Sequence, residues 1–225
     1  MKKAVLAFSL LLNLVLLGYF FVCDSSPSLE EPKPSSESAQ GIRDEKGLVV
    51  DSVNIVMLGN SITYAGDWQR ILDRKDVFNG GKPGWTTQQL SWVIKNFIIP
   101  HTPKLCFFKG GINDYTLGIP TERIYGNMTL VLDSINAVGT IPVFTTTLYQ
   151  KGAFERNRQI DTLNTKMKAF CAAKGYDFVD LRPFLCEDGD IKNQFVQDDN
   201  THLRPEAYPE WAKALRPILK KYGLH

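Results

Sequence analysis

A carboxylate and a histidine stand three residues apart near the end of the chain, where residues 199–202 read Asp-Asn-Thr-His. At this spacing Asp199 can accept a hydrogen bond from Nδ1 of His202. That bond fixes the imidazole tautomer and leaves Nε2 free to take a proton from a nucleophile. Of the other two histidines, His225 is the last residue and His101 has no acid close to it in the sequence. The pattern therefore predicts His202 as a general base that Asp199 orients.

Ser61 is the candidate nucleophile. Residues 53–58 form a short, mostly apolar run, the pattern of a buried parallel strand, and Gly59-Asn60-Ser61 follows directly. Ligands bind at the carboxyl edge of open α/β sheets. A serine at this turn can present its hydroxyl to a cleft and its N–H to a developing oxyanion. A serine in this position can equally well cap the next helix, and the residues alone leave both roles open.

Two further glycine-rich loops follow apolar strand patterns. The pattern at 77–79 leads into a loop that contains Gly84, and the pattern at 104–109 leads into a loop that contains Asn113. Gly84 can offer an unobstructed backbone N–H, and Asn113 can offer a side-chain amide. With the Ser61 N–H they would supply three donors to an oxyanion. An ordinary glycine turn and an Asx turn would also explain these two residues.

The elements that must position these residues alternate between strand and helix. Such alternation predicts a three-layer α/β/α sandwich with a central, parallel, five-stranded sheet. We expect strands at 53–58, 77–79, 104–109, 141–146 and 176–180, and helices near 66–75, 86–97, 121–138, 155–174 and 205–222.

The N-terminal region predicts an exported protein. Lys2 and Lys3 precede an apolar run over residues 4–23, so we expect 1–23 to be a signal peptide or membrane anchor. Retention as an anchor, lipidation of Cys23 and cleavage all remain open. Residues 24–47 are rich in Ser, Pro and Glu, which predicts a flexible linker. The catalytic domain is expected to span 48–225, outside the cytoplasm and either tethered or secreted.

Composition excludes some classes of function. The 225 residues carry a net charge of only +2, without a basic stripe, so nucleic acid is not an expected partner. The histidines are scattered and no Cys-x-x-Cys pair occurs, so we expect neither a metal site nor a cofactor. A disulfide between Cys171 and Cys186 is permitted by export but not established. The oligomeric state is not predicted.

Four segments fall in the order of the four blocks of the SGNH/GDSL hydrolase superfamily, which the chain resembles from about Val53 to Leu219. Each motif is weak alone, but four in order form a strong signal. The resemblance implies a flavodoxin-like α/β/α fold and a GDSL-type esterase. The segments are Gly59-Asn60-Ser61-Ile62-Thr63, Gly84, Gly111-Ile112-Asn113-Asp114 and residues 199–202.

In that family the serine is the nucleophile, the last block completes a triad, and the serine N–H, a glycine and an asparagine form the oxyanion hole. Carried over by position, these roles fall on Ser61, Asp199, His202, Gly84 and Asn113. The family block favours Asp199 over Asp198, which spacing alone leaves as a competing acid. The usual Asp of the first block is Asn60 here. We expect this departure to change the support of the turn more than the chemistry.

The expected activity is hydrolysis of small acyl esters, above all acetyl esters on carbohydrate, through an acyl-enzyme. Tyr64, Trp85 and Tyr115 each closely follow a motif residue, and their rings would suit stacking on a sugar. Packing of the loops would explain them equally well. A lysophospholipase or thioesterase, an acetyltransferase, and a glycan-binding module with a degenerate site remain alternatives. No Gly-x-Ser-x-Gly elbow of the α/β-hydrolase type occurs.

Overall fold

A parallel five-stranded β-sheet forms the centre of the computed structural model, which describes residues 42–224. Neighbouring strands pair in parallel throughout, which confirms the predicted sheet. All residues of the first three strands are buried, as expected for strands that helices cover on both faces. In chain order the strands are β3 (Ile55–Gly59), β4 (Val77–Gly81), β5 (Leu105–Phe108), β6 (Ile141–Thr145) and β7 (Asp177–Val179), and in space they run β4-β3-β5-β6-β7.

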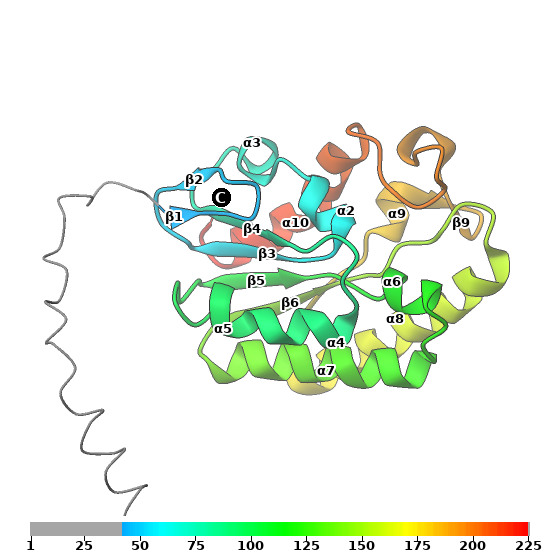
Figure 1. Ribbon diagram of the computed structural model, residues 1–225, viewed down its shortest axis with the longest axis horizontal. Helices are drawn as coiled ribbons and strands as arrows, with labels where there is room; N and C mark the ends of the chain where they lie inside the picture. Colours follow the sequence, from blue (N-terminus) through cyan, green and yellow to red (C-terminus); the bar gives the residue numbers. More distant parts are fainter. Residues whose placement is uncertain (1–41, 225) are drawn as a thin grey trace, which may run out of the picture. The chain divides into compact units, whose positions relative to one another are not determined.

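Helices cover both faces of this sheet, as predicted (Figure 1). One face carries α4 (Thr87–Leu90), the 3-10 helix η1 (Ser91–Val93), α5 (Ile94–Phe97), α7 (Thr121–Ala137) and α8 (Phe154–Lys174). The other face carries α2 (Ser61–Ala65), α3 (Trp68–Leu72) and α10 (Ala207–Lys221). The shorter elements α6 (Ile112–Thr116), α9 (Arg182–Leu185), β8 (Cys186–Glu187), β9 (Asp190–Ile191) and η2 (Asn193–Phe195) complete the connections.

The sheet order places three candidate loops at one edge. Strand β3 lies between β4 and β5, so the turn that carries Ser61 lies between the loops that carry Gly84 and Asn113. The Lys82 N–H donates to the Gly59 carbonyl at 2.8 Å, which ties the first two loops together. The positions predicted for chemistry therefore share the carboxyl edge of the sheet.

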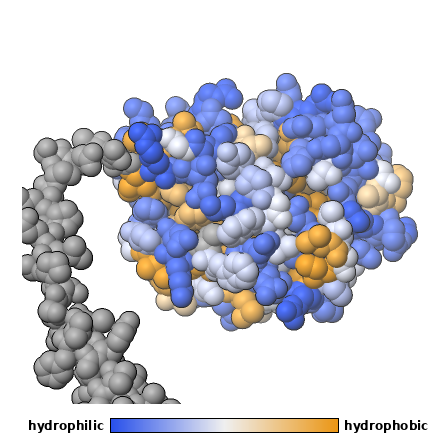
Figure 2. Space-filling model, viewed as in Figure 1, coloured by the Kyte–Doolittle hydropathy of each residue, from blue (hydrophilic) through white to orange (hydrophobic). Residues whose placement is uncertain are grey.

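An aromatic cluster joins α10 to α3 on the α2 face of the sheet. The ring centroids of Trp68 and Trp211 lie 4.9 Å apart in an edge-on arrangement, and Tyr208 stacks on Trp211. Edge-on aromatic pairs stabilise a fold by about 0.5–1.5 kcal/mol beyond the area they bury. The face in Figure 2 is mainly hydrophilic, with apolar residues in small separate groups.

The structured domain begins earlier than the predicted boundary at Leu48. Strands β1 (Ile42–Arg43) and β2 (Val49–Val50) form an antiparallel hairpin. The first strand and the turn of this hairpin lie in the segment that we expected to be linker. The Asp44 carboxylate accepts the N–H groups of Lys46 and Leu48 in this hairpin, and the Glu45 N–H donates to the Asn79 carbonyl of β4. These polar contacts fix the turn of the hairpin and hold it against β4.

Several expectations fall outside the described residues, namely the anchor or signal at 1–23, most of the linker, and His225. Across residues 42–224 no helix is long and apolar enough to cross a membrane. Cys106, Cys171 and Cys186 are all free thiols. The disulfide that the sequence left open between Cys171 and Cys186 is therefore not formed.

Candidate active site

Ser61 is the first residue of α2, directly after β3. Asn60 occupies the N-cap position, and its Oδ1 accepts the Ile62 N–H at 3.2 Å. The capping role that the sequence left open for Ser61 therefore belongs to Asn60. The N–H of Ser61 is a first-turn donor without a partner in its own helix. Both its hydroxyl and its N–H are thus available for other contacts.

The turn before Ser61 requires glycine because the chain approaches it closely. A Cβ on Gly59 would lie 2.1 Å from Thr63 Oγ1 and 2.7 Å from the Lys109 carbonyl oxygen. On the other side of α2, the buried Tyr208 hydroxyl donates to the Ile62 carbonyl at 2.8 Å. The start of α2 is therefore held against both β5 and α10.

His202 and Asp199 meet Ser61 in the arrangement that the spacing predicts. Nε2 of His202 lies 2.8 Å from Ser61 Oγ, and Nδ1 lies 2.5 Å from Asp199 Oδ2. The other oxygen of Asp199 accepts the N–H groups of Thr201 and His202, each at 2.9 Å. One carboxylate thus shapes the turn and orients the ring.

The charge on Asp199 is stabilised by these contacts. Burial alone would raise the pKa of its carboxyl. The hydrogen bonds from the backbone and ring of His202 and from the Thr201 N–H outweigh that effect and lower the pKa to about 2. Both side chains remain partly open to solvent, with 48% of Asp199 and 38% of His202 exposed. Asp199 therefore stays ionised at neutral pH, as an orienting acid must.

Asp198, the competing acid, points elsewhere. Its side chain is 99% exposed and its Oδ1 accepts a hydrogen bond from Arg204 at 2.7 Å. His101 lies in the loop before β5, where its ring lies 5.4 Å from that of Phe78. Among the described residues, the structure brings Asp199 rather than Asp198 to the imidazole of His202.

The loop between β6 and α8 supports the turn that holds His202. Nε2 of Gln150 donates to Thr201 Oγ1 at 2.8 Å, and the Lys151 N–H donates to the Asn200 carbonyl at 2.9 Å. Asn200 has a φ of 60°, a left-handed conformation that asparagine adopts more readily than most residues. These supports join segments that are far apart in the chain, so no local sequence pattern predicts them.

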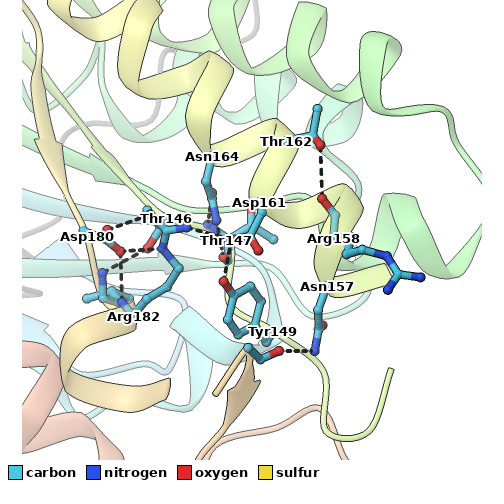
Figure 3. A network of polar contacts seen from close by, with 12 residues as sticks. Thr146, Thr147, Tyr149, Asn157, Arg158, Asp161, Thr162, Asn164, Asp180 and Arg182 are labelled. Atoms are coloured by element: carbon cyan, nitrogen blue, oxygen red, sulfur yellow. Dashed lines mark hydrogen bonds and ion pairs between the residues drawn. The ribbon is translucent and has the colours of Figure 1, made fainter. Parts of the chain in front are cut away.

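Two asparagines of α8 hold this loop in turn (Figure 3). Asn164 bonds both the N–H and the carbonyl of Thr147, at 3.0 and 2.9 Å. Asn157 does the same for Gln150, at 2.9 and 3.0 Å. Each asparagine amide thus pairs with both backbone groups of one loop residue. These bonds take the place of the backbone hydrogen bonds that a residue in a β-sheet would form with a neighbouring strand. The support beneath His202 is therefore anchored to a long helix.

An ion-pair network lies beside these asparagines (Figure 3). Arg182 bonds Asp161 of α8 and Asp180 at the end of β7, both at 2.7 Å. The Tyr149 hydroxyl donates to the same Asp161 carboxylate. Burial would raise the pKa of Asp180, but the hydrogen bonds from Arg182 lower it below its usual value. The network links the loop after β6 to β7 and α8.

Gly84 forms the corner of a tight turn at the second candidate loop. Its φ is +78°, Pro83 precedes it, and the Trp85 N–H donates to the Lys82 carbonyl at 3.2 Å. This is a type II turn, which needs glycine at its third position. The Gly84 N–H has no acceptor within residues 42–224. It is therefore free to donate to a ligand.

Asn113 connects the third loop to the second. Its Nδ2 donates to the Trp85 carbonyl at 2.9 Å, which leaves one amide hydrogen for another acceptor. The buried Asp114 accepts both the N–H and the hydroxyl of Thr87, at 2.9 and 2.6 Å. Burial raises the pKa of the Asp114 carboxyl above its usual value. These contacts fix the start of α4, and with it the turn of Gly84, relative to Asn113.

The three aromatic candidates have different surroundings. Tyr115 is only 6% exposed, and its hydroxyl donates to the Gln159 carbonyl and contacts Thr121. It packs inside the fold, which favours the loop-packing interpretation of this residue over stacking on a substrate. Tyr64 and Trp85 are partly exposed, and the ammonium groups of Lys46 and Lys82 lie 5.8 and 5.6 Å from their ring centroids. These two remain candidates for substrate contact.

Comparison with known proteins identifies the family. Residues 57–209 match the model of the GDSL-like lipase/acylhydrolase family. The chain belongs to this family. One relative of this GDSL-family hydrolase is the Escherichia coli K12 protein named thioesterase 1/protease 1/lysophospholipase L1. The two are 25% identical over 181 residues, and the match covers 73% of this chain and 84% of that protein.

Another relative is the N-acylneuraminate cytidylyltransferase of Streptococcus agalactiae, which is 26% identical over 156 residues, or 68% of this chain and 35% of that protein.

Solved structures share the fold of this GDSL-family hydrolase. A GDSL-like lipase from Bacteroides thetaiotaomicron aligns with a TM-score of 0.66 at 20% identity, over 75% of this chain and 88% of that one. A lipase/acylhydrolase from Enterococcus faecalis aligns with a TM-score of 0.65 at 19% identity, over 76% and 96%.

Proposed function

We propose that this GDSL-family hydrolase is an exported serine esterase that removes small acyl groups, above all acetyl, from carbohydrate. The observation that carries the proposal is the chain of contacts from Ser61 Oγ to His202 at 2.8 Å and from His202 to Asp199 at 2.5 Å. A nucleophile, a base within hydrogen-bond reach and a third group that orients the base form the arrangement needed for acyl transfer.

The reaction has two halves. Ser61 Oγ forms a bond to the ester carbonyl carbon while its proton passes to Nε2 of His202. The bond from that carbon to the sugar oxygen then breaks, and His202 returns the proton to the departing oxygen. A water molecule, deprotonated by His202, attacks the acyl-enzyme and releases the acid together with free Ser61.

The oxyanion of each tetrahedral intermediate requires donors that are already in place. We assign them to the N–H groups of Ser61 and Gly84 and to the second amide hydrogen of Asn113. The free Gly84 N–H supports this assignment, and so does the bond of Asn113 to the Trp85 carbonyl, which fixes the direction of the amide. Losing one such donor typically lowers turnover by roughly 10²–10³-fold.

Short loops favour a small acyl group. Strand β3 ends at Gly59 and α2 begins at Ser61; β5 ends at Phe108 and α6 begins at Ile112. Such connections are too short to build a lid over a long acyl chain. Carbohydrate is supported by the partly exposed rings of Tyr64 and Trp85, and by the relative that is named for a sugar, N-acylneuraminate. Export is supported by the two lysines before the apolar run at 4–23.

A long-chain acyl substrate is the competing function, because the Escherichia coli relative is named thioesterase and lysophospholipase. A substrate panel separates the two. The purified full chain should show its highest kcat/KM on acetylated oligosaccharides, with lower values on p-nitrophenyl acetate. Higher kcat/KM on lysophosphatidylcholine or palmitoyl-coenzyme A would reject the carbohydrate esterase.

The nucleophile is tested by Ser61→Ala, with Ser52→Ala as the matched control because Ser52 is exposed and lies outside the site. Hydrolysis of p-nitrophenyl acetate should fall by roughly 10⁴-fold or more in Ser61→Ala and be unchanged in Ser52→Ala. Retention of most activity in Ser61→Ala would reject the mechanism whatever the substrate.

A further inference from the structure

Lys109 is a buried cation beside the turn that carries Ser61. Only 1% of the residue is exposed, and its N–H donates to the Leu58 carbonyl at 3.0 Å, which places it next to Gly59. Within the described part of the chain, its Nζ has no hydrogen-bond partner. An ammonium group removed from water without a partner is strongly unfavourable. The surroundings of Nζ therefore call for an explanation.

Other buried polar atoms around Lys109 also lack partners among residues 42–224. They are Thr63 Oγ1, Thr145 Oγ1, Trp211 Nε1 and, one residue before Ser61, Asn60 Nδ2. In native folds almost every buried polar atom is hydrogen-bonded. Several exceptions in one region point to a shared partner that is not a side chain.

Three of these residues lie close to Lys109. The ring centroid of Trp211 is 5.8 Å from Nζ. Both Thr63 Oγ1 and the Lys109 carbonyl approach Gly59, within 2.1 and 2.7 Å of the position that a Cβ would occupy there. Thr145 and Lys109 each follow the last pair of the β5–β6 ladder, Phe108 with Phe144, so they lie side by side on the face that α10 covers.

The donor set defines the chemistry of the missing partner. An ammonium and an indole N–H can only donate hydrogen bonds, and threonine hydroxyls can donate as well as accept. The partner must therefore accept several bonds. Nζ lies over the face of the Trp211 ring, 5.8 Å from its centroid. An acceptor bound to Nζ therefore lies beside the indole.

Charge favours an anion over water. Within the described residues no carboxylate pairs with Lys109. The neighbouring titratable group is Cys186, and burial raises the pKa of its thiol to about 12, so it supplies no negative charge. Without a counter-charge, burial lowers the pKa of Lys109 to about 7. An anion beside Nζ would stabilise the charged form more strongly than a neutral water molecule would.

We propose that Lys109, Trp211, Thr63 and Thr145 form an internal site for one small monovalent anion, with chloride as its physiological occupant. The bound anion links β5, β6 and α10 to α2, whose first residue is Ser61. It stabilises the folded state because it binds the folded chain and not the unfolded one. Through Thr63 it also contacts α2, the helix that begins with Ser61. The site does not depend on which ester the enzyme cleaves.

Thermal unfolding of the purified full chain tests the site. At constant ionic strength, Tm should be higher in sodium chloride or bromide than in sodium gluconate, by at least about 3 °C near saturation. Lys109→Met keeps the length of the side chain and removes its charge, so this variant should lose the difference. Lys213→Met should keep it, because Lys213 is exposed on α10. Equal Tm values in chloride and gluconate, or an unchanged difference in Lys109→Met, would overturn the proposal.

A crystal of the unmodified protein soaked in sodium bromide gives a second readout that needs no variant. The site predicts an anomalous peak within hydrogen-bond reach of Lys109 Nζ and Trp211 Nε1. Water without anomalous signal at this position, or bromide bound only at the surface as an adventitious ion, contradicts the site.

Discussion

Nε2 of His202 lies 2.8 Å from Ser61 Oγ, although 141 residues separate the two positions in the chain. Both residues are held in place by hydrogen bonds from neighbouring groups. Asn60 and Tyr208 hold the start of α2, and Asp199 and Gln150 hold the turn of His202. The distance falls within the range for proton transfer, so the proposed nucleophile and its proposed base are already in contact in the free protein.

Asp199→Asn tests the orienting acid. The asparagine cannot stabilise the imidazolium and favours the wrong tautomer, so kcat should fall by roughly 10⁴-fold with little change in KM. Asp198→Asn is the matched control, because Asp198 is adjacent but bonds Arg204. Steady-state kinetics on p-nitrophenyl acetate checks both variants. A larger loss in Asp198→Asn would reverse the assignment.

Acid should remove the stabilisation that Asp199 provides. The pKa of its carboxyl is lowered from 3.8 to about 2 in the folded protein, so as pH falls the unfolded chain takes up the proton first. The contribution is complete above about pH 4 and is lost as pH falls toward 2. The difference in Tm between the wild type and Asp199→Asn should therefore shrink over this window. A difference that stays constant from pH 5 to pH 2 would contradict the lowered pKa.

Asn113→Ala tests the oxyanion hole. It removes a donor that we assign to the transition state, so kcat should fall by roughly 10²–10³-fold while KM changes little. Asn127→Ala is the control, since its Nδ2 supports the same helix start by donating to Thr87 Oγ1 at 3.1 Å. Kinetics and urea unfolding of both variants separate the two effects. Equal losses of kcat would mean that Asn113 acts only by holding α4.

Tyr208→Phe tests how α2 is positioned. Loss of the hydrogen bond to the Ile62 carbonyl should lower the free energy of unfolding by about 1–3 kcal/mol and should also lower kcat. Tyr222→Phe removes a comparable hydroxyl at the far end of α10, which bonds Asp177 at 2.6 Å. That variant should lose stability but keep its kcat. If both variants kept full kcat, α2 would not depend on Tyr208 for its position.

The central sheet could be predicted because its strands are continuous apolar runs. Residues 55–59 and 105–108 are buried on both faces, so their composition alone marks them as strands. The helix expected over 86–97 consists of α4, η1 and α5 instead. The helices α2 and α6, of five residues each, are too short for a periodic pattern and were not predicted.

The grouping of Ser61, His202 and Asp199 could also be predicted, since Asp199 and His202 are close in the sequence and Ser61 follows a recognisable strand. Their supports could not. Gln150 and Asn157 lie in segments without a motif. They support the site through hydrogen bonds to groups in other segments of the chain, namely the Thr201 hydroxyl and the Gln150 carbonyl. The burial of Tyr115 could not be predicted for a related reason: its place after Asn113 does not reveal that the ring faces the core.

The central claim is that His202 activates Ser61 as a nucleophile, and covalent trapping measures this most directly. A fluorophosphonate probe added to the wild-type protein should modify one residue, Ser61, as read by mass spectrometry of the digested chain. The adduct should be lost in Ser61→Ala and form far more slowly in His202→Ala. An active enzyme that carries the adduct on another residue, or labels equally fast without His202, would contradict the account.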